Sequence, residues 1–284
     1  MHLSGLTNIL AKFPYNAFRY MLFFLVAVVI FIIIFILIAP SMLENLLTPK
    51  NPEKAKKLGD DLINAKDLTV LVVVAHPDDV DWYAGGTLHK LHKNDNKIIV
   101  VLGTSGEKGG NAKGFPEIRE KEQKESGEVL GYDEIIFLRY PDRDLKYDEE
   151  FKKKITEIVE KYRPNTLFTF DIEEEGYFYH HSDHRAAGRV AIDVAKEFPE
   201  ITGIYLFHSS LVNVIVDIGD VVGLKTEALD LHKSQSINTF RKYFSILPDS
   251  LFPSDAKEWR NTNPRIAKEA GLEYCEIFRK LGEQ

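Results

Sequence analysis

The sequence predicts an α/β fold, in which a mostly parallel sheet carries helices on both faces and is preceded by one transmembrane helix. Three observations support this prediction. Strand-like apolar runs alternate with helical segments, which is the pattern of βαβ units. The run at 69–74 (TVLVVV) consists of β-branched and aliphatic residues, as expected of a strand buried on both faces of a parallel sheet. A separate stretch, 21–39, contains no charged side chain.

The segment 21–39 has about the length that a helix needs to cross the hydrocarbon core. A signal peptide would have a shorter apolar region and a small-residue cleavage site, and a buried helix of a globular domain would show a polar stripe. We therefore expect an N-terminal flank (1–20), a transmembrane helix (21–39), a juxtamembrane linker (40–61) and one large domain (62–284). Four lysines follow the segment within eighteen residues, so the positive-inside rule favours a single-pass membrane protein whose large domain is cytoplasmic.

Within the large domain, strands and helices are expected to alternate. The predicted strands are 69–74, 97–102, 134–138 and 165–170, and the predicted helices are 82–93, 116–130, 148–162 and 185–198. The helix at 116–130 contains few apolar residues, so we expect it to lie on the surface. The glycine-rich loop at 103–116 lacks the P-loop pattern, because Lys108 is followed by glycine. We expect this loop either at the mouth of a site or as a plain connection.

Composition narrows the function classes. The chain of 284 residues carries a formal net charge of -7, whereas nucleic-acid binders show a basic excess, so we expect no nucleic-acid partner. Its one cysteine, Cys275, excludes an intrachain disulfide and a site with several thiolate ligands. His89 and His92 lie one helical turn apart, but no third ligand is near them in the sequence. We interpret both as solvated helix residues.

Two polar clusters follow predicted strands. His76, Asp78 and Asp79 come directly after the first strand, and the sequence HHSDH at 180–184 opens the last helix. Ligands of open α/β sheets bind beyond the carboxyl ends of the strands, so we expect the two clusters to meet. A catalytic zinc ion takes three nitrogen or oxygen ligands and keeps one position open. His76, Asp79 and His184 supply such a set.

This arrangement leaves two further groups beside the ion. Asp78 could take a proton from the bound water, and His181 could stabilise or protonate what leaves. Metal binding lowers the pKa of water to about 7, so the pattern predicts hydrolysis of a carbonyl or phosphoryl bond. Zinc is the predicted cofactor, although imidazole and carboxylate ligands accept other divalent metals.

Six short motifs occur in a fixed order. They are AHPDD after the first strand, GGTL, SGEKG after the second strand, IREKE, YPD, and an H-x-D-H that opens a helix of small residues. Together they resemble the PIG-L/LmbE-like family of zinc-dependent de-N-acetylases, which includes the N-acetylglucosaminyl-phosphatidylinositol deacetylases. The likeness spans about 71–235 and includes LHKSQ at 231–235.

The resemblance implies a Rossmann-like catalytic domain that hydrolyses the N-acetyl group of an N-acetylglucosamine-containing substrate. The family's functional residues fall on these positions: metal ligands His76, Asp79 and His184; catalytic residues Asp78, His181, Asp183 and Tyr179; and substrate contacts Arg119 and Asp142. Asp78 matches the general base, and His181 matches the residue that stabilises the oxyanion and assists the leaving amine. Asp183 would orient a neighbouring histidine, and Tyr179 would be a second oxyanion donor.

The sequence departs from the family pattern at two places. The family motif AHPDDE has Val80 in place of the glutamate, with Asp81 one residue later, and HSDH stands in place of HPDH. Two alternatives stay open: hydrolysis of another amide or phosphoester bond at the same site, or a non-catalytic, membrane-tethered sugar-binding module. Membrane attachment would suit a lipid-linked acetamido sugar. The sequence leaves the aglycone and the oligomeric state open.

Overall fold

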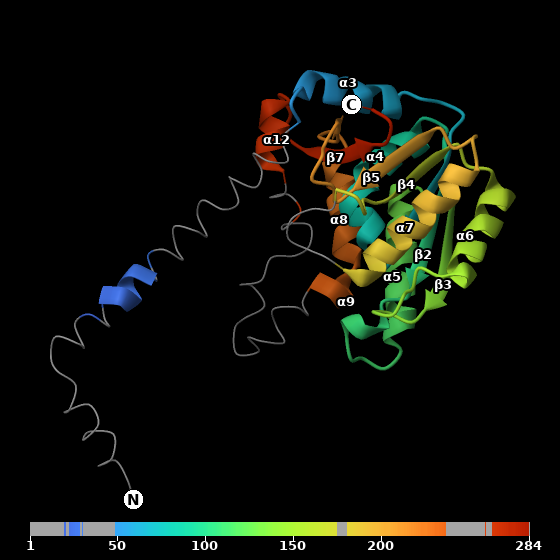
Figure 1. Ribbon diagram of the computed structural model, residues 1–284, viewed down its shortest axis with the longest axis horizontal. Coiled ribbons are helices and arrows are strands. Elements are labelled where there is room, and N and C mark those ends of the chain that lie inside the picture. Colours follow the sequence, from blue (N-terminus) through green and yellow to red (C-terminus); the bar gives the residue numbers. More distant parts are fainter. Residues whose placement is uncertain are drawn as a thin grey trace, which may run out of the picture. The chain divides into compact units, whose positions relative to one another are not determined.

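The computed structural model of the protein describes residues 20, 23–28, 30, 49–174, 181–236, 259 and 263–283. The chain divides into two compact units, Met1–Leu46 and Leu47–Gln284. The sheet, the helices labelled in Figure 1 and the candidate site all belong to the second unit.

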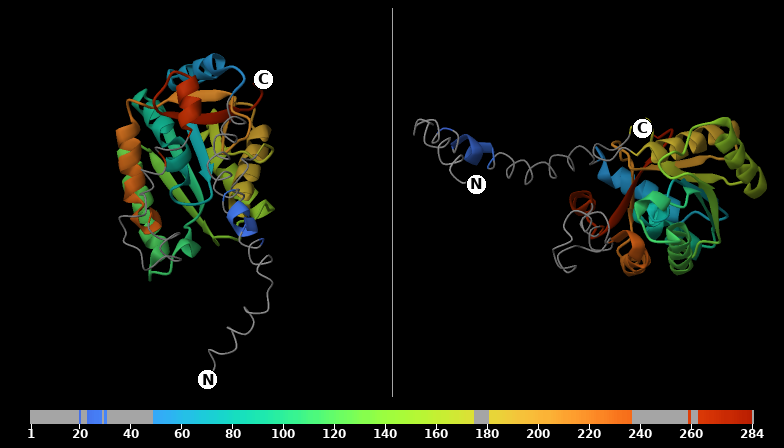
Figure 2. Two further views of the ribbon diagram at one scale, coloured as in Figure 1. Left: turned by 90° about the vertical axis from the view of Figure 1, so that its left-hand side faces the viewer. Right: turned by 90° about the horizontal axis from the view of Figure 1, so that it is seen from below.

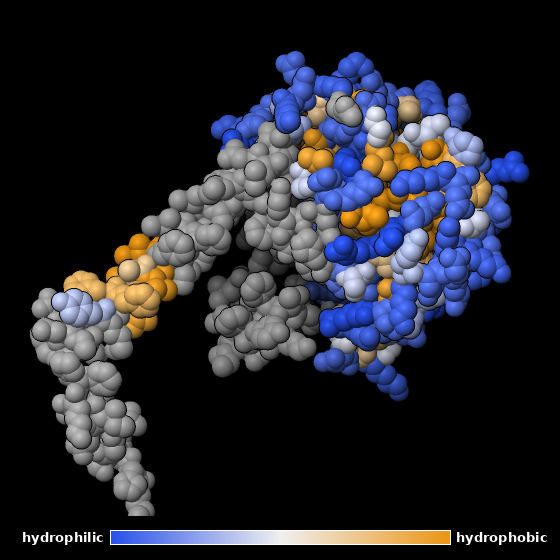
Figure 3. Space-filling view, viewed as in Figure 1, coloured by the Kyte–Doolittle hydropathy of each residue, from blue (hydrophilic) through white to orange (hydrophobic). Residues whose placement is uncertain are grey.

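The predicted transmembrane helix lies largely outside the described residues, which include only 23–28 and Ile30 of the range 21–39. Residues 23–28 are helical and exposed, and Figure 3 colours this stretch as hydrophobic. In the part of the chain that the structure describes, no helix combines the length and the apolar character that crossing a membrane requires. This finding contradicts the predicted single-pass membrane localisation with a cytoplasmic catalytic domain.

The second unit is built on a seven-stranded sheet with the order β3-β2-β1-β4-β5-β7-β6. The strands are β1 (Thr69–Val74), β2 (Lys97–Thr104), β3 (Glu134–Tyr140), β4 (Thr166–Phe170), β5 (Gly203–Phe207), β6 (Val214–Asp217) and β7 (Cys275–Lys280). The first five strands are parallel, and β7 runs antiparallel to both β5 and β6. The predicted mostly parallel α/β sheet is therefore confirmed. The strand order reverses at β1, which places the carboxyl ends of β1 and β4 side by side.

Helices cover both faces of the sheet, as predicted (Figures 1 and 2). They are α3 (Pro52–Ile63), α4 (Asp79–Lys93), α5 (Phe115–Leu130), α6 (Glu149–Tyr162), α7 (Ser182–Glu197), α8 (Val222–Leu231), α9 (Lys233–Ser236) and α12 (Pro264–Glu269), with a 3-10 turn η1 (Glu107–Gly109). α4, α5 and α8 pack together on one face, and α6 packs against α7 on the other. α3 overlaps the predicted linker and packs on β6.

The core forms around β1 and β2, whose apolar side chains are fully buried. Most of these residues are β-branched, and their burial on both faces is typical of central parallel strands.

The ends of the helices carry residues that are typical of helix caps. Asp148 caps α6 by accepting a hydrogen bond from the N–H of Phe151 at 2.9 Å, and α5 ends at Gly131, whose φ of 83° is the left-handed conformation that favours glycine.

Helix α7 lies close to β4 at Gly188, where a side chain would not fit. A Cβ atom at this position would lie 2.6 Å from the backbone oxygen of Phe170, so a larger residue would push the helix away from the strand. His184 lies one turn earlier on the same helix, and its ring stacks on the ring of Phe170 with the centroids 3.9 Å apart. The glycine therefore sets the distance at which α7 delivers His184 to the end of the sheet.

A buried ion pair ties α4, α8 and β7 together. Lys225 and Glu276 are 0% and 2% exposed and form a hydrogen-bonded ion pair. The Glu276 carboxylate also accepts from the N–H groups of Gly86 and Thr87, at 2.9 and 2.7 Å, and Lys225 donates to the backbone oxygen of Trp82 at 2.7 Å. The pair thereby fixes the part of α4 that follows the site residues.

We expect Lys225→Met to lower the free energy of unfolding by about 3–5 kcal/mol, because removing one partner leaves the other charge buried and uncompensated. Urea unfolding monitored by circular dichroism measures this change. The matched control is Lys57→Met, which removes an exposed pair with Asp61 (74% and 58% exposed side chains) and should change stability far less. Equal losses in the two variants would contradict the interpretation.

Candidate active site

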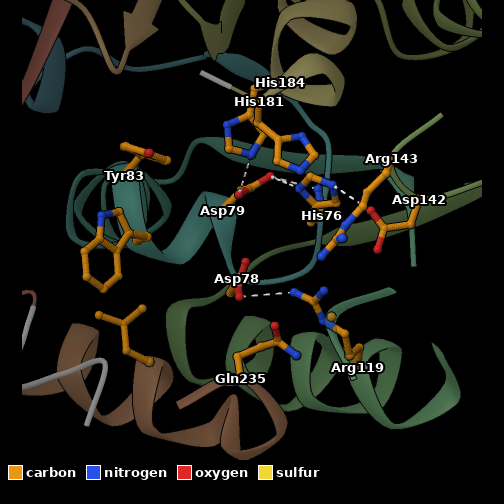
Figure 4. Close-up of a pocket in the computed structure, with 13 residues that line it drawn as sticks. His76, Asp78, Asp79, Tyr83, Arg119, Asp142, Arg143, His181, His184 and Gln235 are labelled. Carbon is orange, nitrogen blue, oxygen red and sulfur yellow. Dashed lines mark hydrogen bonds and ion pairs between the residues drawn. The ribbon is translucent and has the colours of Figure 1, made fainter. Parts of the chain in front are cut away.

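A pocket lies beyond the carboxyl ends of β1 and β4, where the strand order reverses and ligands of open α/β sheets bind. Its lining residues are His76, Asp78, Asp79, Trp82, Tyr83, Gly109, Arg119, Asp142, Arg143, His181, His184, Leu229 and Gln235. Figure 4 shows that the imidazoles gather on one side of this pocket, with Asp78 and Arg119 on the other. Both clusters singled out in the sequence reach the same pocket.

The carboxylate of Asp79 contacts imidazoles from both clusters. Its Oδ1 lies 3.2 Å from Nε2 of His184, and its Oδ2 lies 3.4 Å from Nδ1 of His76. Asp79 is the first residue of α4, three positions earlier than the predicted helix start, and its Oδ2 also accepts from the N–H of His76 at 2.8 Å. The charge of His184 and the hydrogen bonds to the two imidazoles outweigh the effect of burial and hold the pKa of Asp79 well below its usual range.

His76 lies among carboxylates. Its Nε2 is 3.3 Å from Oδ1 of Asp142 and 3.3 Å from Oδ2 of Asp183. Burial alone would lower the pKa of His76, but hydrogen bonds to these carboxylates and to Asp79 outweigh it and raise the pKa well above the ordinary value. The pKa of Asp142 falls to about 2, because its hydrogen bonds to His76 and to the N–H of Lys108 outweigh burial. The site thus strongly favours positive charge at the position of His76.

Two sets of donor atoms could hold a metal ion in the described part of the chain. The sets are His76, His181 and His184, and His76, Asp142 and Asp183; within each set the donor atoms lie within 4.8 Å of one another. The predicted ligands His76, Asp79 and His184 do not form either set, although the Asp79 carboxylate contacts two members of the first. Imidazole nitrogens and carboxylate oxygens are the donors that zinc and similar divalent ions take, so the residues present fit such an ion.

The hydrogen bonding of His181 distinguishes it from the other two histidines. Its Nδ1 accepts the backbone N–H of Asp183 at 3.2 Å, so the neutral imidazole carries its proton on Nε2. Burial and the charges of His76 and His184 lower the pKa of His181, which favours its neutral form. With its proton on Nε2, His181 presents a hydrogen-bond donor at the pocket wall, and the residue is also a member of the three-histidine donor set.

Asp78 is held in a strained backbone conformation with φ of 92°, which costs a residue with a side chain about 1–3 kcal/mol. Its N–H donates to Oε1 of Gln123 at 2.9 Å, and its Oδ2 accepts from Arg119 at 3.1 Å. Burial raises the pKa of Asp78 above its usual value, and the Arg119 charge opposes that rise. A carboxylate with a raised pKa suits proton transfer near neutral pH.

The remaining predicted residues differ in what they contact. Arg119 is 4% exposed and donates to the backbone oxygens of Pro77 and Gly106, so it supports the turn before Asp78 while also lining the pocket. The Asp183 carboxylate contacts His76, as described above, and accepts from the N–H of Arg143 at 2.6 Å. Tyr179 lies outside the described residues.

Several pocket residues were missed in the sequence. Trp82, Tyr83, Arg143, Leu229 and Gln235 line the pocket but carry no isolated signal. Gln235 belongs to the LHKSQ motif, which indicated a family segment without indicating a role. The helix at 116–130, expected on the surface, instead buries a polar face that includes Arg119 and Gln123. A count of apolar residues could not reveal this buried face, because its side chains form hydrogen bonds around the site instead of packing in an apolar core.

Fold and site together define an α/β protein with a candidate histidine–aspartate metal centre at the strand-order reversal. Residues 71–195 match the PIG-L family, described as GlcNAc-PI de-N-acetylase. The chain is 30% identical over 189 residues to a diacetylchitobiose deacetylase of Thermococcus kodakarensis, which covers 58% of this chain and 69% of that relative. The chain belongs to the PIG-L family.

Two further proteins show the same likeness. The "Probable N-acetyl-alpha-D-glucosaminyl L-malate deacetylase 2" of Bacillus cereus is 29% identical over 187 residues, covering 59% of this chain and 83% of that protein. The solved structure of N,N'-diacetylchitobiose deacetylase from Pyrococcus horikoshii, in complex with an inhibitor, superposes with a TM-score of 0.65 at 27% identity, covering 79% of this chain and 90% of that one. The fold therefore extends well beyond the segment that the family match covers.

We expect His184→Ala to weaken zinc binding by about 100-fold or more, because changes to groups that merely support a metal ligand already cost about 10–100-fold. Isothermal titration of the metal-free protein with Zn²⁺ measures the affinity. The control is His92→Ala, since the His92 imidazole pairs with Asp133 away from the pocket and its loss should leave the titration unchanged. Equal zinc affinity in both variants would contradict the candidate metal centre.

Proposed function

We propose that the protein is a zinc-dependent deacetylase that hydrolyses the N-acetyl group of an N-acetylglucosamine-containing substrate. The observation that carries this proposal is the contact of Asp79 with both His76 and His184, beside a carboxylate, Asp78, that points into the same pocket (Figure 4). The family match and the relatives, which are named as deacetylases of acetamido sugars, support the substrate class.

In this proposal His76, Asp79 and His184 hold the metal ion. The negative field that raises the pKa of His76 would equally stabilise a divalent cation, and the Nδ1 hydrogen bond of His181 leaves that residue for proton chemistry. When bound, a zinc ion lowers the pKa of water to about 7 and polarises a carbonyl group. Asp142 and Arg119 lie on the pocket wall, where a carboxylate and a guanidinium can bind sugar hydroxyls or the aglycone.

The reaction needs two proton transfers, one from the attacking water to the chain and one from the chain to the leaving amine. Asp78 takes a proton from the water that attacks the acetamide carbonyl carbon. His181 donates a hydrogen bond from Nε2 to the developing oxyanion. The C–N bond then breaks, the amine nitrogen receives a proton from Asp78 or His181, and the products are acetate and the free amino sugar. Asp183 supports His181 through its backbone N–H and contacts His76 through its carboxylate.

We expect Asp78→Asn to lower kcat for acetate release by about 10²–10⁴-fold, because an amide cannot act as the base. The assay uses zinc-loaded protein and a panel of N-acetylglucosamine glycosides, oligosaccharides and glycolipids, with N-acetylated peptides and phosphoesters as comparison substrates. Zinc stoichiometry should stay at the parental value. Parental protein that is inactive on every acetamido sugar but cleaves another amide or a phosphoester would refute the proposal, as would activity that survives chelation.

We expect His181→Ala to lower kcat for acetate release while zinc affinity stays close to the parental value. The reason is that His181 acts on the oxyanion and the leaving amine but does not hold the ion. Acetate release and zinc titration on the same preparation separate the two roles. A loss of zinc affinity comparable to that of His184→Ala would show that His181 is a ligand instead.

A further inference from the structure

A second carboxylate, Asp81, lies fully buried behind Asp78. It accepts hydrogen bonds from four side chains: Tyr132 on Oδ1 at 2.8 Å, and Gln123 at 3.1 Å, His232 at 2.7 Å and Ser126 on Oδ2. A buried carboxylate with this many donors is an acceptor only, because both of its oxygens are occupied by N–H or O–H groups. Each of these four side chains must therefore act as a hydrogen-bond donor toward Asp81.

Because Asp81 only accepts hydrogen bonds, the side-chain amide of Gln123 can take only one of its two orientations. Its Nε2 donates to Oδ2 of Asp81, and the other end of the same amide, Oε1, must then face the N–H of Asp78, which donates to it at 2.9 Å. The flipped amide would place an oxygen against the carboxylate and two N–H groups against each other. Gln123 is 0% exposed, so bulk solvent does not reach either bond.

The backbone N–H of Asp78 lies at the strained point of the turn, where φ is 92°. The Asp78 carboxylate is held separately, by a hydrogen bond from Arg119. Without an acceptor for its N–H, the backbone of Asp78 could relax toward an ordinary φ, and the carboxylate would move with it. Both anchors come from α5, one turn apart on its buried face.

We propose that Gln123 and Asp81 are positioning residues for Asp78: Asp81 fixes the Gln123 amide, and Gln123 holds the Asp78 backbone in the conformation that aims its carboxylate into the pocket. This inference rests on the proposed function for its effect on rate. It also gives Asp81, the residue that follows Val80 where the family has glutamate, a defined role.

The test compares Gln123→Met and Asp81→Ala with two matched controls. Each variant breaks the series of hydrogen bonds that runs from the Asp78 N–H through the Gln123 amide to Asp81. Each should lower kcat for acetate release by about 10–100-fold, with KM within about twofold and zinc stoichiometry unchanged. Hydrogen exchange of the Asp78 amide should become faster in both.

The two controls keep the hydrogen bonds that link Asp78, Gln123 and residue 81. Asp81→Asn should keep most of the parental kcat, because asparagine can turn its oxygen toward Gln123 and donate its amide to the hydroxyl oxygen of Tyr132. Tyr132→Phe removes a bond to the far oxygen of the same carboxylate, so it should lower the unfolding midpoint and leave kcat unchanged.

Parental kcat and parental Asp78 exchange in Gln123→Met would overturn the proposal, and this variant decides the question if Asp81→Ala does not fold. A loss of kcat in Tyr132→Phe as large as in Gln123→Met would also overturn it, since the effect would then follow stability alone. If the parental protein releases no acetate from any acetamido sugar, the proposed function fails. The positioning claim is then decided by Asp78 amide exchange, which must be faster in Gln123→Met than in Tyr132→Phe.

Discussion

The site depends on one carboxylate that two distant segments of the chain share. Asp79 begins α4 directly after the first strand, and His184 lies in the first turn of α7, yet the two side chains are in contact. This contact requires the strand order to reverse at β1, so that the loops after β1 and β4 open into one crevice. It also requires α7 to lie close to β4, which Gly188 permits. The fold is thus the means by which two short polar motifs become one site.

Charge explains why this arrangement suits a cation. His76 is surrounded by Asp79, Asp142 and Asp183, and the site raises the pKa of the imidazole despite its burial. Like charges this close repel one another in a medium of low dielectric constant, so a cluster of carboxylates is stable when a proton or a metal ion neutralises it. Burial would raise the pKa of Asp142 and of Asp183, but hydrogen bonds to His76 and to backbone N–H groups outweigh it and lower both.

Polar bonding also organises the wall behind the site. Helix α5 buries four polar side chains, each with a defined partner: Arg119, Glu120, Glu122 and Gln123. The Glu122 carboxylate, for example, accepts hydrogen bonds from the backbone N–H and the hydroxyl group of Ser234. These bonds anchor α9, which carries Gln235 into the pocket. A helix that looks like a surface helix by its composition is therefore a structural support of the site. The predicted membrane span at 21–39 is contradicted because no helix in the described part of the chain is long and apolar enough to cross a membrane.

The sequence by itself determined the alternation of strands and helices, the two polar clusters and their family, because these depend on local residue order and on spacing along the chain. It could not determine that Asp79 belongs to a helix, which histidine Asp183 contacts, or that Gln123 and His232 both bond to Asp81, over separations of 42 and 151 residues. Only the tertiary structure decided these points. Hydrogen-bond direction and charge proximity act over a few ångströms in space, and a linear pattern holds no record of which distant groups come that close.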